Sequence, residues 1–155
     1  MFSVYKKILV PYDGSKQSDK ALKHACDLAK HSGAHVFLLN VVPDILLPPL
    51  AATNLRGEGK SSKDLLKELY FNLKSNAKTM LESKKKNYEE KNVTISIFVT
   101  MGNTTAKIIE YIKEKNVDLV VLGTTGMSGF SKIKALGSVA RNVSEKSPCP
   151  VLLVP

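Results

Sequence analysis

The sequence has few of the features that mark membrane, secreted or disulfide-linked proteins. Its two cysteines, Cys26 and Cys149, are far apart and fit neither a disulfide framework nor a zinc motif. No run approaches the ~20 apolar residues of a membrane-spanning helix, and no secretory leader precedes the first apolar segment. Repeats and low-complexity tracts are also missing. We therefore expect a cytoplasmic protein with free thiols and no membrane segment.

Length and charge leave more possibilities open. A chain of 155 residues fits a single domain, which we expect to span 1–155. The net charge of +9 is compatible with nucleic acid, anionic lipid or a polyphosphate ligand. Lys84–Lys86 and nearby lysines lie among glutamates, with few aromatic residues for base stacking. We interpret them as a solvated helix face, which disfavours nucleic-acid binding.

Apolar runs and helical repeats alternate along the chain. The run from His35 to Val42 lacks polar alternation, which is typical of a parallel strand buried on both faces. Strands are expected at 6–10, 35–42, 93–100, 118–122 and 150–154, and helices at about 15–32, 61–92, 104–115 and 137–146. Right-handed crossovers would wind these elements into an α/β fold, a Rossmann-like, open, twisted sheet of five parallel strands with helices on both faces.

The stretch from 43 to 62 interrupts this alternation. It contains prolines and glycines without a strong period, as in a flexible loop or lid. The long helix that follows carries one apolar stripe, formed by Leu66, Leu69, Tyr70, Leu73, Ala77, Met80 and Leu81. The length of this helix leaves room for a break within it.

Ligands of open α/β sheets bind beyond the carboxyl ends of the strands, where the strand order reverses. The loop from Gly123 to Gly129 occupies such a position, and Gly137-Ser138 opens the next helix. Glycines and helix N-terminal amides suit a phosphate. The alternative is a tight structural turn with Ser138 as the helix N-cap. The loop has neither a Walker lysine nor the Gly-x-Gly-x-x-Gly spacing.

Asp13 follows the first strand in the segment Pro11-Tyr12-Asp13-Gly14-Ser15. Its carboxylate suits a ribose, a base or a cation held through phosphate. The alternative is an Asx turn or a cap for the first helix. Pro11 and Val41 suit an apolar wall for a purine, and core packing explains them equally well.

Several of these segments resemble the universal stress protein family. They are Ile8–Ser15, Asn40–Val42, Asp118–Gly126, Leu136–Ala140 and the ending Pro148–Pro155. The resemblance extends over the whole chain and implies a homodimer formed through the C-terminal strand near Val151–Val154. An exposed strand edge is a surface that proteins usually pair or cover, so strand chemistry and resemblance agree.

The family includes members that bind ATP through a Gly-x2-Gly-x9-Gly-Ser/Thr pattern. Here ten residues, 127–136, separate Gly126 from Gly137, and Thr125 stands where many relatives carry a basic residue. One extra residue in a loop costs little free energy, so ATP binding remains the favoured interpretation. By resemblance, the adenosine end would be held by Pro11, Tyr12, Asp13 and Val41, and the ribose and phosphates by Gly123, Gly126, Gly137, Ser138 and Val139.

The resemblance implies a stress-response or signalling module that binds ATP, with or without Mg2+ or Mn2+. Asp13 is the one candidate carboxylate near the motif, so the sequence leaves the metal unknown. No base or Walker lysine is assignable, so we expect no enzyme, or at most a weak ATPase. The alternatives are a slow ATP hydrolase and a family member without nucleotide that works through an unknown protein partner. The histidines and cysteines are expected to be structural or solvated.

Overall fold

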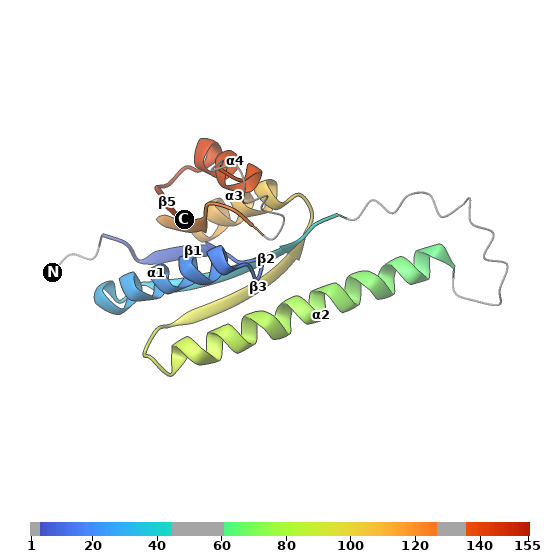
Figure 1. Ribbon diagram of the computed structural model, residues 1–155, viewed down its shortest axis with the longest axis horizontal. Helices are drawn as coiled ribbons and strands as arrows, with labels where there is room; N and C mark the ends of the chain where they lie inside the picture. The colour runs from blue at the N-terminus through green and yellow to red at the C-terminus, as the bar shows by residue number, and fades with distance from the viewer. Residues whose placement is uncertain (1–3, 45–60, 127–135) are drawn as a thin grey trace.

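The computed structural model describes residues 4–44, 61–126 and 136–155 (Figure 1). The strands are β1 (Lys7–Pro11), β2 (His35–Val42), β3 (Ile95–Met101), β4 (Leu119–Gly123) and β5 (Val151–Val154). The helices are α1 (Lys16–Ser32), α2 (Ser62–Glu89), α3 (Thr104–Lys115) and α4 (Ser138–Lys146). These bounds lie within a few residues of those expected. The predicted lid at 43–62 falls largely outside the described residues.

The strands form one parallel sheet in the order β3-β2-β1-β4-β5. This confirms the predicted five-stranded α/β fold. β1 pairs with β2 on one side and with β4 on the other, so the strand order reverses at β1. Loops leaving β1 and β4 therefore diverge to opposite faces of the sheet. The crevice between them is the position where open α/β sheets bind ligands.

Two helical layers cover the sheet, which explains its apolar strands. Figure 1 shows α1 and α2 on one side and α3 and α4 on the other. Alternate residues of β1 serve the two cores: Ile8 and Val10 pack with the α1 and α2 side, and Leu9 packs with the α3 and α4 side. None of the helices in the described ranges has both the length and the apolar character needed to cross a membrane.

Capping residues define the ends of α1 and α3. Ser15 caps α1 by accepting a hydrogen bond from the Ser18 amide at 3.1 Å, and Gly33 ends it with a φ of 71°. Asn103 caps α3 through the Ala106 amide at 2.9 Å. α4 differs, because its N-cap is Gly137, which has no side chain to form a capping hydrogen bond. The alternative that Ser138 is the N-cap is therefore wrong.

α2 is one continuous helix whose two halves differ in burial. Ala77 and Leu81 in its second half are buried, and Leu81 belongs to the core on this side of the sheet. Its first half extends past the carboxyl ends of the strands (Figure 1). Leu69 and Phe71 are exposed there. The helix runs from Ser62 to Glu89 without the break that its length allowed, and its apolar stripe is exposed at Leu69.

Candidate functional site

A cavity of about 920 Å3 opens at the carboxyl end of the sheet. β1, β2 and β4, the start of α4 and the middle of α2 contribute its walls. All nine residues singled out from the sequence line it: Pro11, Tyr12, Asp13, Val41, Gly123, Gly126, Gly137, Ser138 and Val139. The fold therefore brings together segments that are more than a hundred residues apart in the chain.

Asp13 lies where the loop after β1 meets the loop after β4. One carboxylate oxygen, Oδ1, accepts a hydrogen bond from the Ser15 amide at 2.9 Å, which is the expected Asx turn. A Cβ atom built on Gly126 would stand 2.8 Å from the other oxygen, Oδ2. The exposed carboxylate thus has a structural role, and it also lies at the cavity wall.

The glycines of this region have different physical roles. A Cβ on Gly123 would stand 2.8 Å from Gln17 Cβ and 2.9 Å from the Gln17 carbonyl carbon, so Gly123 lets α1 pack closely on β4. A Cβ on Gly137 would lie 3.1 Å from the Thr124 carbonyl oxygen, which accepts a hydrogen bond from the Gly137 amide at 2.8 Å. The start of α4 is therefore fixed to the end of β4.

The uncapped start of α4 makes this end of the cavity attractive to anions. The first turn of a helix has amide groups without intrahelical partners and carries the positive end of the helix dipole. Gly137, Ser138, Val139 and Ala140 all line the cavity. Backbone amides and the Ser138 hydroxyl at such a position suit a phosphate group.

The opposite end of the cavity is largely apolar and firmly held. Pro11 and Val41 line it together with Leu39 and Val42. The Asn40 side-chain amide donates to the Tyr12 carbonyl oxygen at 2.9 Å, and the Tyr12 amide donates to the Leu39 carbonyl oxygen at 2.8 Å. These bonds tie the ends of β1 and β2 together, leaving apolar surface that suits a flat aromatic ring.

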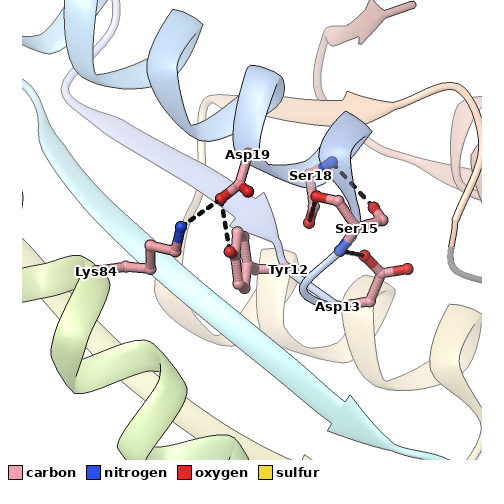
Figure 2. A network of polar contacts seen from close by, with 6 residues as sticks. All are labelled: Tyr12, Asp13, Ser15, Ser18, Asp19 and Lys84. Carbon is pink, nitrogen blue, oxygen red and sulfur yellow. Dashed lines mark hydrogen bonds and ion pairs between the residues drawn. The ribbon is translucent and has the colours of Figure 1, made fainter.

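A polar network joins this end of the cavity to two helices (Figure 2). Asp19 Oδ1 in α1 accepts a hydrogen bond from the Tyr12 hydroxyl at 2.6 Å and another from Lys84 Nζ of α2 at 2.7 Å. Burial raises the pKa of Tyr12, and its hydrogen bond to Asp19 raises it further. Burial opposes ionisation of Asp19, but the bonds from Lys84 and Tyr12 outweigh it and lower the pKa of Asp19.

Sequence reasoning missed this network. Lys84 was assigned to a solvated face, and that assignment is wrong because its side chain reaches Asp19 and lies 5.8 Å from the Tyr12 ring centroid. The α2 wall of the cavity, formed by Leu73, Asn76, Ala77 and Met80, was also not expected. No local pattern signals a contact between α1 and a helix turn 65 residues away.

The other reactive residue types lie away from the cavity. Cys26 is buried in the core, which raises its pKa to about 12, and Cys149 is partly exposed and free. His35 stacks on Phe37 and shares a hydrogen bond with Ser96 Oγ at 2.8 Å. Within residues 4–44, 61–126 and 136–155, no group of three His, Cys, Asp or Glu side chains could hold a metal ion.

The sequence and the fold both match known proteins. The model of the universal stress protein family matches residues 4–155. Universal stress protein MJ0531 of Methanocaldococcus jannaschii is 38% identical over 155 residues, covering 98% of this chain and 83% of that protein. Universal stress protein YxiE of Bacillus subtilis is 34% identical over 151 residues, covering 97% and 99%.

Among solved structures, that of M. jannaschii MJ0577 is similar to this chain with a TM-score of 0.81 and 31% identity, covering 97% of this chain and 96% of the other. A universal stress protein from Archaeoglobus fulgidus, solved in complex with dAMP, shares the fold with a TM-score of 0.64 and 19% identity, covering 98% and 99%.

Two glycine variants should separate the packing role of Gly123 from the cavity role of Gly126. Gly123→Ala should lower the free energy of unfolding by roughly 1–3 kcal/mol, because the new Cβ meets Gln17 backbone. Gly126→Ala should change it by less than about 0.5 kcal/mol, because the exposed Asp13 carboxylate can move. Urea unfolding followed by circular dichroism measures both. Equal losses would contradict these assignments.

Proposed function

The chain belongs to the universal stress protein family, and on that premise we propose that it binds an adenine nucleotide, ATP in particular, in the cavity beyond β1 and β4. One observation carries the proposal: the uncapped start of α4 and the Asp13 loop line the same cavity. The dAMP complex of the A. fulgidus protein, which shares this fold, is consistent with it.

The proposed orientation follows from the two ends of the cavity. The adenosine end lies against Pro11, Tyr12, Asp13 and Val41, where apolar surface adjoins one carboxylate. The ribose and phosphates lie against Gly123, Gly126, Gly137, Ser138 and Val139, at the loop after β4 and the start of α4. Backbone amides held in place at the start of a helix need no rearrangement to bind an anion, so they favour binding of the phosphate end of the ligand there.

The described part of the cavity wall offers few protein ligands to a divalent cation. Asp13 is the carboxylate that the described residues place at the cavity wall. Mg2+ and Mn2+ prefer oxygen ligands, and in nucleotide sites the phosphates supply several of them. We propose that Mg2+ or Mn2+ enters with ATP and is held mainly by the phosphate oxygens.

We propose nucleotide binding rather than turnover as the activity. Among the described residues that line the cavity, the ionisable side chains are Asp13 and Tyr12. Rapid phosphoryl transfer relies on cationic groups at the transferred phosphate and on a group that orients water. A nucleotide-responsive stress or signalling module accords better with a wall of amides and hydroxyls.

We also propose that the chain forms a homodimer through β5. This strand pairs with β4 along one edge and is the last strand in the sheet order, and Leu152 is exposed on it. An apolar edge strand with unpaired backbone groups is a surface that proteins usually cover. Pairing with a second copy about a two-fold axis would cover it with identical chemistry.

Calorimetry with ATP, alone and with Mg2+ or Mn2+, tests the nucleotide proposal. We expect saturable binding with a dissociation constant below about 1 mM. Gly126→Val should weaken it about tenfold or more, because the larger side chain occupies the position of the Asp13 carboxylate. Gly126→Ala should give an intermediate loss. Absence of saturable binding at millimolar ATP would contradict the proposal, and unchanged affinity in Gly126→Val would place the nucleotide elsewhere.

Sedimentation velocity tests the dimer. Leu152→Lys should convert a dimer to a monomer, because two lysines would face each other across the two-fold axis. Leu28→Lys is the matched control, since Leu28 in α1 is 38% exposed and Leu152 is 40% exposed. The control should remain dimeric. A wild-type monomer at all concentrations would overturn the proposal.

A further inference from the structure

α2 forms part of the wall of the proposed nucleotide cavity. Ala77 and Met80 of α2 line the cavity, and Met80 also packs against the core on this side of the sheet. A Cβ atom on Gly14 would stand 3.0 Å from the Met80 sulfur, so α2 also touches the loop that carries Asp13. Any movement of α2 away from the sheet would therefore change the shape of the cavity.

Lys84 lies one helical turn beyond Met80, on the same face of α2. Its ammonium group contacts Asp19 Oδ1 at 2.7 Å, and the Tyr12 hydroxyl donates to that same oxygen at 2.6 Å. Figure 2 shows Asp19 between the other two side chains. The Lys84 side chain is 32% exposed, and hydrogen bonds to a charged group are stronger than neutral ones when water is partly excluded.

We propose that Lys84 and Asp19 are positioning residues for the nucleotide site, an inference that rests on the function proposed above. Through Asp19, Lys84 ties the α2 wall to Tyr12 at the adenosine end. Tyr12 is in turn fixed through its backbone to Leu39 and the Asn40 side chain. The network therefore holds opposite sides of the adenosine end, α2 on one side and the ends of β1 and β2 on the other, at a set distance.

This geometry predicts that the network affects the binding of the adenosine part of the ligand. Tyr12 lies at the adenosine end, whereas the amides of α4 lie at the phosphate end. Loss of the network should therefore lower the affinities for AMP and for ATP by the same factor. A loss of positive charge acting at long range would instead weaken ATP more than AMP, because ATP carries more negative charge.

The test is calorimetric titration of AMP and ATP into four full-length variants. Lys84→Met should weaken both ligands by the same factor, about 5- to 50-fold, within the range usual for coupling between linked elements. Lys84→Arg should restore most of the affinity, because a guanidinium can also donate to Asp19. Asp19→Ala should match Lys84→Met, and the double variant should lose no more than either single variant.

Lys85→Met is the matched control. Lys85 is the next residue of α2, its side chain is 37% exposed, and it pairs with Glu89 of the same helix at 3.6 Å. The substitution removes the same charge and leaves Asp19 and Tyr12 in place. It should leave both affinities unchanged within about twofold.

The outcomes separate this inference from the proposed function. If the wild type binds neither nucleotide, both are overturned. If the wild type binds but Lys84→Met behaves like Lys85→Met, or loses ATP affinity selectively, the positioning role alone is overturned. Should Lys84→Met fail to fold, hydrogen exchange in the wild type decides. AMP should slow exchange in α2 between Ala77 and Lys84, and unchanged exchange at saturating AMP would overturn the inference.

Discussion

The pairing of β1 with β2 on one side and β4 on the other determines where the cavity lies. Because β1 is buried on both faces, its residues alternate between two cores, and the two helical layers must diverge at its carboxyl end. The divergence leaves space at the carboxyl end of the sheet, where the cavity lies. Two walls of the cavity, the Asp13 loop and the loop after β4, begin at this reversal of strand order, and α2 adds a further wall.

Within this space, polarity is divided between two ends. The start of α4 offers amides because Gly137 supplies no side-chain cap, and the Thr124 carbonyl fixes its position. The ends of β1 and β2 offer apolar surface, fixed by the Asn40 side chain. An adenine nucleotide has the same division, with a flat ring at one end and anionic phosphates at the other. The polar and apolar ends of the cavity therefore correspond to the phosphate and adenine ends of the proposed ligand.

Much of this arrangement could be predicted from local sequence patterns. Apolar runs such as His35 to Val42 indicate buried parallel strands, and glycines after a strand indicate close backbone approach. The network of Tyr12, Asp19 and Lys84 could not be predicted, because its members belong to three elements and Lys84 lies in a lysine-rich stretch that reads as solvated. The exposure of Leu69 could not be predicted either, because an apolar stripe does not show where the sheet beneath it ends.

The central claim is that a nucleotide occupies this cavity with its phosphates at the start of α4. NMR titration of ATP into 15N-labelled protein measures this directly. We expect saturable shifts of the backbone amide resonances of Gly126, Ser138, Val139 and Ala140. When adenosine replaces ATP, the shifts at Ser138 and Val139 should be smaller. Saturable shifts that leave the start of α4 unmoved would contradict it.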